Sequence, residues 1–263
     1  MLKGTFRKII CLDYRMNGLI GAIIGIVAVI GGIMYSTARP LTVNGYVVNT
    51  YLYILLAILL CTLTIIVMEK YGWTQGVVGG GKMFAVFILA IIVLFGLGAL
   101  GNKHPFLRNI LWVVFVVLLG VMLSPVFNLA TQFDVLWKSI ITVVVLVLVL
   151  TFIASKVPDN YFDSWGMYLS FALLALIVFE LLDIIFFDPG TSGRYKIYAI
   201  IAIVIFSGFV LYDTKGVYKN GAIAADLCGG INGNKECVDY PSQSLGLFLD
   251  IINLFSSVTM VQS

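Results

Sequence analysis

The sequence predicts an all-α polytopic membrane protein. Of its 263 residues, 61% are hydrophobic and only 11% are charged, whereas a soluble domain is about half apolar and a quarter charged. The apolar residues gather in runs of about 20, the length that a helix needs to cross a bilayer. The net charge of +3 is small and spread over the connecting segments, so the chain lacks the basic footprint of a nucleic-acid-binding protein.

Eight apolar runs follow one another along the chain. The first, residues 18–35, comes after a basic N-terminus and is expected to be a retained helix, because it is long for the apolar region of a signal peptide. Seven more spans are predicted at residues 46–68, 83–100, 110–124, 138–154, 165–187, 197–212 and 245–261. The span 197–212 is expected to end at Asp213 and to be followed by a long polar loop, residues 214–242.

Two of these runs carry a carboxylate that hydrocarbon does not tolerate well. An acid at the centre of a membrane helix costs about 2.5–3.5 kcal/mol on insertion scales, so Asp213 and Asp250 are candidate functional residues. Asp250, Asn253 and Ser257 are spaced i, i+3 and i+7 and share one helix face. This polar stripe predicts that the last helix lies at the centre of a bundle, with Asp213 as the partner of Asp250.

Other polar residues carry weaker signals. Glu180 and Asp183 lie three apart on one face of the sixth span, close to its end. One histidine and four cysteines without a CxxC pair argue against a zinc or iron–sulfur site. A slight excess of Lys and Arg on the N-terminal side of an eight-span chain places the loop with Cys228 and Cys237 on the non-cytosolic side, where they could form a disulfide.

Two stretches near the end of the chain carry a resemblance to a known family. The stretch Phe206-Ser207-Gly208-Phe209-Val210-Leu211-Tyr212-Asp213-Thr214-Lys215 and the stretch Ser244-Leu245-Gly246-Leu247-Phe248-Leu249-Asp250-Ile251-Ile252-Asn253-Leu254-Phe255 resemble two motifs of the Bax inhibitor-1 (transmembrane BAX inhibitor motif) family. The resemblance implies a bundle of seven family helices around a polar central C-terminal helix. Residues 1–45 would then be a basic N-terminus with an extra transmembrane helix, and residues 46–263 a Bax inhibitor-1-like transmembrane domain.

The resemblance also implies a function. Members of the family are described as pH-sensitive calcium-leak channels gated by two aspartates, which here are Asp213 and Asp250. Calcium would be the permeant ion and transient ligand of this pair, with no other cofactor. The implied partners are the lipid bilayer and membrane proteins of the cell-death or calcium-handling machinery.

Other residues are candidates for accessory roles, and the family topology differs from the charge distribution on where the cysteines lie. Bacterial members place an arginine that pairs with the first aspartate where this chain has Lys103, so Lys103 is a candidate substitute. Glu180, Asp183 and Asn253 are the other candidate accessory residues. The family topology would put the loop after Asp213 in the cytosol, with reduced cysteines, so the disulfide Cys228–Cys237 stays an open alternative.

Three other functions remain open. An intramembrane aspartyl protease would use a Tyr-Asp on one helix and a Gly-x-Gly-Asp on a later one; Tyr212-Asp213 fits the first motif, but Leu247 and Leu249 replace both glycines of the second. A proton-coupled transporter would use Glu180 and Asp183 as relay acids, and a membrane scaffold would conduct no ion. Because the second protease motif does not fit, the chain is expected not to be an enzyme. The sequence does not distinguish among an ER- or Golgi-like membrane, a mitochondrial inner membrane and a bacterial or viral-host membrane.

Overall fold

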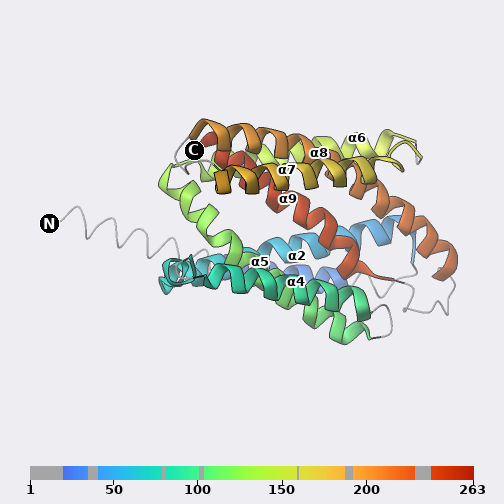
Figure 1. The fold of residues 1–263 in the computed structure, drawn as a ribbon. Coiled ribbons are helices and arrows are strands. Elements are labelled where there is room, and N and C mark those ends of the chain that lie inside the picture. The colour runs from blue at the N-terminus through green and yellow to red at the C-terminus, as the bar shows by residue number, and fades with distance from the viewer. Residues whose placement is uncertain are drawn as a thin grey trace. The chain divides into compact units, whose positions relative to one another are not determined.

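The computed structural model describes residues 20–34, 41–78, 81–100, 104–158, 160–186, 192–228 and 238–263. Within these residues the chain is helical and contains no strand, which confirms the predicted all-α class. The helices, drawn in Figure 1, are α2 (Val43–Lys70), α3 (Trp73–Val78), α4 (Lys82–Leu100), α5 (Pro105–Gln132), α6 (Leu136–Lys156), α7 (Trp165–Phe186), α8 (Ser192–Cys228) and α9 (Tyr240–Gln262).

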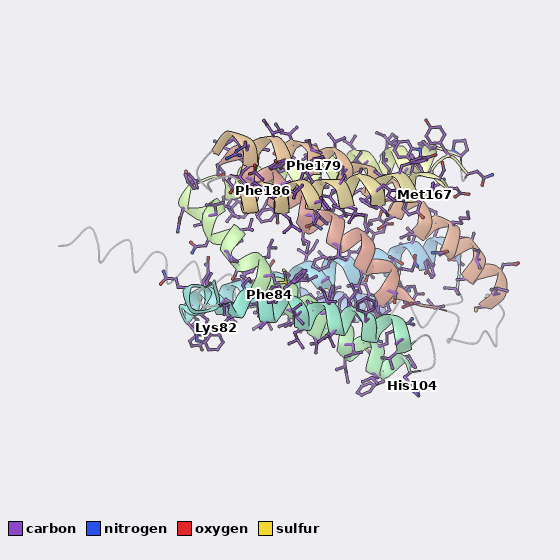
Figure 2. All side chains as sticks on the ribbon, in the orientation of Figure 1. Lys82, Phe84, His104, Met167, Phe179 and Phe186 are labelled. Atoms are coloured by element: carbon purple, nitrogen blue, oxygen red, sulfur yellow. The ribbon has the colours of Figure 1, made fainter. Side chains whose placement is uncertain are left out.

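Seven of these helices, all except α3, are long and apolar enough to cross a membrane. Their outward faces carry large apolar side chains, such as Phe84 on α4 and Met167, Phe179 and Phe186 on α7, each more than half exposed (Figure 2). Apolar surface of this extent is unfavourable in water, whereas hydrocarbon solvates it. The chain is therefore an integral multi-pass membrane protein.

A shorter apolar helix, Ile20–Met34, precedes the seven long ones. It packs against α2 through its glycines: a Cβ at Gly25 would lie 3.2 Å from Leu59, and one at Gly32 would lie 3.6 Å from Leu52. Small residues allow such close approach of membrane helices. The basic N-terminus and both ends of the predicted span 18–35 lie outside the described residues.

The chain forms two compact units. The first comprises residues 1–125 and 224–244, and the second comprises residues 126–223 and 245–263. In the first unit α5 packs tightly on α2, since a Cβ at Gly120 would lie 2.8 Å from Thr64 and 3.1 Å from the carbonyl oxygen of Cys61. In the second unit α6, α7 and α8 run side by side (Figure 1), and the end of α9 is bound to α6 because Ser139 donates to Gln262 Oε1 (3.1 Å).

Helix α5 is longer than its sequence indicates. Residues 110–124 are the predicted core of this span, with Pro125 near its end, but the helix continues through the proline to Gln132. Proline removes the amide that would bond to the carbonyl four residues earlier, which is that of Val121. Ser124 Oγ donates to this carbonyl instead (2.8 Å), and such replacement bonds are what make proline tolerable inside membrane helices.

The expected loop after Asp213 is also wrong. Helix α8 continues to Cys228, so its 37 residues measure about 55 Å at 1.5 Å per residue, well beyond the roughly 30 Å of a bilayer core. The segment after Asp213 contains no proline, and it buries Val217 and Ala224, which favours continued helix. Asp213 therefore lies inside a helix rather than at its end.

Helix α9 is the most buried of the seven. Half of its apolar window is buried, against a third or less in each of the others. Leu247, Phe248 and Leu254 are completely buried, and so are the polar residues Ser244 and Thr259. This burial agrees with the expectation that a helix carrying a polar stripe lies inside protein rather than against lipid.

Candidate functional site

The centre of the candidate site is a pair of carboxyl groups in the second unit. Asp213 of α8 and Asp250 of α9 lie within hydrogen-bonding distance of each other. Asp250 is only 6% exposed, and Asp213 is half-buried. The structure thus brings the two predicted acids together, while their role as a gate stays a prediction.

Three neighbouring residues of α8, Tyr212, Asp213 and Lys215, contact different parts of the second unit. Tyr212 lies against Gly166 of α7, where a Cβ would come within 2.7 Å of the tyrosine ring. Lys215 Nζ donates to the carbonyl oxygen of Val157 (2.7 Å), at the C-terminal end of α6. Successive residues of a helix are rotated by about 100°, so Asp213 projects from another side of α8 than Tyr212 and Lys215, and its carboxyl group lies beside Gly246 of α9. The Tyr-Asp-Thr-Lys stretch therefore orients the carboxyl group through its neighbours.

Helix α9 makes room for this carboxyl group with a glycine. Asp213 Oδ2 lies directly beside Gly246, one turn before Asp250, where the Cβ of any other residue would overlap it. Asp250 Oδ2 is buried, and no hydrogen-bond partner for it lies among the described residues. A buried acceptor without a donor is costly, so this oxygen is available to a proton or a cation.

The accessory candidates are dispersed. Asn253 lies one turn beyond Asp250 on α9 and is half-buried. Asp183 forms an ion pair with Arg194 of α8 (2.8 Å), and Glu180 lines a separate cavity. Their role as relay acids stays a prediction. Lys103 lies outside the described residues.

The structure describes only one cysteine of the candidate disulfide. Cys228, the last residue of α8, is buried and disulfide-bonded, whereas Cys61 of α2 is free. Cys237 lies outside the described residues, so its pairing with Cys228 stays a prediction.

We expect mass spectrometry of unreduced peptides to find Cys228 joined to Cys237, since disulfides persist in oxidising compartments. In a Cys228→Ser variant, Cys237 should become reactive to a thiol-alkylating reagent without prior reduction. The matched control is Cys61→Ser, which removes a free thiol and should leave Cys237 unreactive. Alkylation of Cys228 in the unreduced wild type would contradict the disulfide.

A second polar cluster, in the first unit, was not predicted from the sequence. Arg108 of α5 is 6% exposed, and its Nη2 lies 2.6 Å from Asp239 Oδ2. The other oxygen of Asp239 accepts from the backbone N–H of Ser242 (3.0 Å), which caps the start of α9. One turn further along α5, Trp112 Nε1 donates to Ser244 Oγ (3.2 Å). The only local signal was an acid two residues before Pro241, a pattern that favours the start of a helix.

Aromatic residues surround this cluster. Asn49 Nδ2 donates to the hydroxyl of Tyr240 (3.1 Å). The ring of Tyr240 lies 5.2 Å from that of Tyr46 and 5.8 Å from that of Tyr53, between ring centroids. Residues 239–244 are thus bound to both α2 and α5, which fixes the first turn of the helix that carries Asp250.

Comparison with known proteins identifies the family of this chain. Residues 43–262 match the family model described as "Inhibitor of apoptosis-promoting Bax1". Protein LIFEGUARD 2 of Arabidopsis thaliana is 32% identical over 184 residues, covering 66% of this chain and 68% of its own. LIFEGUARD 1 of the same plant is 28% identical over 182 residues, covering 68% and 70% of the two chains. An uncharacterised protein of Borreliella burgdorferi is 29% identical over 178 residues, covering 64% and 71%.

The match to the family model extends over all seven long helices, from α2 to α9. It therefore includes the two acids, the glycine that faces them and the Arg108–Asp239 cluster. The short helix Ile20–Met34 precedes the matched region. The chain belongs to the family of inhibitors of apoptosis-promoting Bax1.

Proposed function

We propose that this protein is a proton-gated calcium leak of the Bax inhibitor type that lowers the calcium content of a membrane-bound store. The observation that carries the proposal is the Asp213–Asp250 pair. It places two carboxyl groups within hydrogen-bonding distance inside helices that are long enough to cross a membrane.

The Asp213–Asp250 pair holds a proton when the calcium leak is closed. An ionised carboxylate can only accept hydrogen bonds, so a bond between two carboxyl groups requires a proton on one of them. Removing it leaves two negative charges, whose repulsion is on the order of 4 kcal/mol at 4 Å and an effective dielectric of 20. Loss of the proton as pH rises therefore separates α8 and α9 at this point.

The same oxygens then attract a divalent cation. Calcium takes six to eight oxygen ligands, with carboxylates preferred. Among the described residues, no three His, Cys, Asp or Glu side chains come close enough to hold a metal ion together. Two carboxylates, completed by water, suit transient contact with a passing ion better than tight binding.

Calcium efflux from liposomes that contain the purified protein tests the proposal. Across roughly pH 5 to 9, wild-type efflux should rise with pH. In Asp250→Asn the pH dependence should disappear, because a carboxamide does not release a proton in this range.

Asp226→Asn is the matched control, since it removes an exposed acid from α8 and should leave the pH profile unchanged. Equal, pH-dependent efflux in the double variant Asp213→Asn/Asp250→Asn would sink the proposal. A protein that is silent at every pH would favour a membrane scaffold that conducts no ion.

The alternative function is proteolysis, because soluble aspartic proteases also use two acids that share one proton. The segment before Asp250 argues against it, because Leu247 and Phe248 are completely buried and leave no open strand-like backbone for a substrate. Incubation with a transmembrane model substrate should therefore give no cleavage that depends on Asp250.

A further inference from the structure

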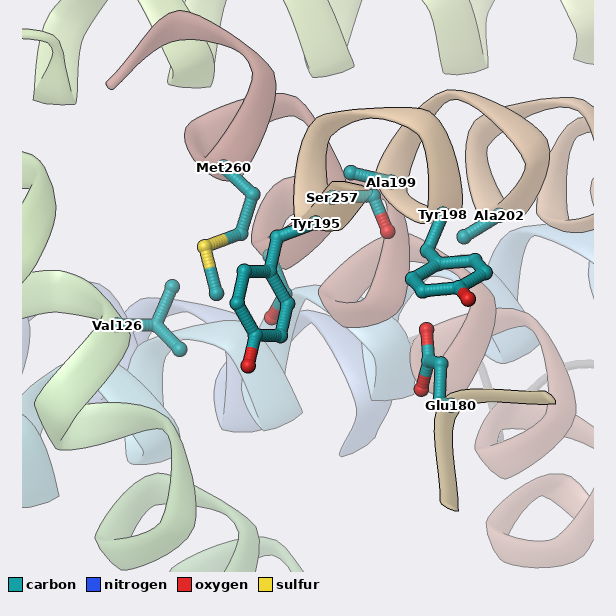
Figure 3. A pocket seen from close by; sticks show the side chains of 9 residues that line it. Val126, Glu180, Tyr195, Tyr198, Ala199, Ala202, Ser257 and Met260 are labelled. Atoms are coloured by element: carbon teal, nitrogen blue, oxygen red, sulfur yellow. The ribbon is translucent and has the colours of Figure 1, made fainter. Parts of the chain in front are cut away.

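The second unit contains a cavity apart from the aspartate pair. Its volume is about 210 Å³, and it is lined by α7, α8, α9 and the part of α5 that follows Pro125. Figure 3 shows the carboxylate of Glu180 pointing towards the ring of Tyr198, with Tyr195, Ser257 and Met260 around the same space. The cavity therefore combines one acid, several hydroxyl groups and an apolar wall.

Glu180 is the only uncompensated charge that this cavity presents among the described residues. Asp183, one turn further along α7, is neutralised by Arg194 at 2.8 Å. The other cation at the start of α8, Lys196, is exposed and forms no ion pair with Glu180 in the described part of the chain. A carboxylate next to hydrocarbon is unfavourable without a counter-charge, so the cavity favours a cationic occupant.

The cavity lies near one boundary of the membrane-spanning region. Helix α7 ends at Phe186, six residues after Glu180, and α8 begins at Ser192, just before Tyr195 and Tyr198. Tyrosines are enriched at the headgroup level of membranes. Tyr195 and Met260 are 37% and 40% exposed, so the cavity opens at the surface of the unit.

The lining favours an organic cation over a metal ion. A calcium ion needs six or more oxygen ligands and usually several charges, but one carboxylate and a few hydroxyls supply fewer. Tyrosine rings beside a carboxylate are the features that recognise ammonium groups, including quaternary ones. The volume is below the 300–1,000 Å³ of drug-sized pockets, so it fits a head group and the first carbons of a chain.

We propose that this cavity binds the ammonium head group of a membrane amphiphile. The ammonium lies at the Glu180 carboxylate beside Tyr195 and Tyr198. The alkyl chain leaves along Met260 into the bilayer. The site is distinct from the Asp213–Asp250 pair, so its occupation can be measured without any calcium flux.

Native mass spectrometry of the protein in maltoside micelles tests the proposal with three probes. Dodecyltrimethylammonium has both features of the ligand, tetramethylammonium has the cation without the chain, and a dodecyl maltoside with a labelled chain has the chain without the cation. Wild-type protein should bind one dodecyltrimethylammonium in preference to the other two. Glu180→Gln, which keeps the size of the side chain, should weaken this binding about tenfold, as expected for loss of a charge-assisted contact.

Two further variants sharpen the test. Tyr198→Leu should weaken binding several-fold, because it removes an aromatic face but keeps an apolar side chain. Asp134→Asn is the matched control: Asp134 is exposed, has a left-handed backbone (φ 57°) that asparagine also adopts, and lies outside the cavity. It should bind the probe as the wild type does. Melting temperatures of all variants establish that they are folded.

Three results would overturn the proposal. Unchanged binding in folded Glu180→Gln would show that the carboxylate does not recognise the probe. Tetramethylammonium bound as tightly as the tailed probe would identify the ligand as a soluble ammonium compound rather than a lipid. Equal affinity for the maltoside would mean that the cavity selects the chain and not the charge.

Discussion

Replacing Gly246 by alanine is expected to abolish the pH dependence of the calcium leak. Asp213 Oδ2 lies where the new Cβ would be, so either the carboxyl group or α9 must move. Either shift separates Asp213 from Asp250, so the two carboxyl groups can no longer share a proton. The closed state at low pH then loses the hydrogen bond that stabilises it. Calcium efflux at pH 5 should rise towards its value at pH 9, and the ratio of the two should approach one.

The same substitution should lower stability. Inserting a methyl group into a packed interface costs about 1–3 kcal/mol in the free energy of unfolding. Asp213→Ala in the Gly246→Ala background should recover much of this loss, because it removes the atom that the methyl group overlaps, and contacting residues couple in this way. The recovered protein should still lack pH-dependent efflux.

Gly216→Ala is the control for the glycine substitution. Gly216 lies on α8, three residues after Asp213, and a Cβ there would meet nothing within 4 Å. This variant should keep both the pH profile and the melting temperature of the wild type. A Gly246→Ala protein with wild-type efflux at pH 5 would mean that the contact with Asp213 does not control the leak.

Much of the fold could be predicted because hydrocarbon imposes a length. Every long helix of the structure overlaps an apolar run that is visible in the sequence. The site was visible for a related reason: the insertion cost of an acid makes Asp213 and Asp250 conspicuous in such runs. The periodicity of residues 250, 253 and 257 then indicated which face of α9 is polar.

The helix ends were harder to predict because their causes lie outside the apolar pattern. The apolar pattern predicts only residues 110–124 of α5, but the helix continues through Pro125 because the hydroxyl of Ser124 satisfies the carbonyl of Val121. The polar residues after Asp213 were expected to form a loop, but Lys215 and Lys219 of α8 bind Val157 and Asp163, on the connection between α6 and α7. Hydropathy does not reveal such partners.

The Arg108–Asp239 pair was missed for the same reason. No local spacing joins two residues that are so far apart in sequence, and each taken alone is typical of a loop beside a membrane helix. Similarly, Gly246 is unremarkable in a helix that contains several small residues. Its function is defined only by the carboxylate that α8 places against it.

Replacing Arg108 by methionine is expected to lower the free energy of unfolding by about 3 kcal/mol. Removing one partner of a buried ion pair typically costs 3–5 kcal/mol, because it leaves the other charge uncompensated. The lower end applies here, since the side chain of Asp239 is 21% exposed while that of Arg108 is 8% exposed. Denaturant unfolding in detergent micelles, followed by tryptophan fluorescence, measures the difference.

The chain contains a matched control for this substitution. Lys219 and Asp163 form an ion pair at 3.1 Å, but both side chains are about half exposed. Exposed pairs contribute less than about 1 kcal/mol, so Lys219→Met should have little effect. Similar losses for the two methionine variants would show that burial does not strengthen the Arg108–Asp239 pair.

The double variant Arg108→Met/Asp239→Asn separates charge from packing. Asparagine caps a helix about as well as aspartate, so it can still accept the N–H of Ser242 at the start of α9. It leaves no buried charge, and the double variant should therefore be more stable than Arg108→Met alone. A double variant as unstable as the single one would instead mean that α9 depends on the packing of the guanidinium rather than on its charge.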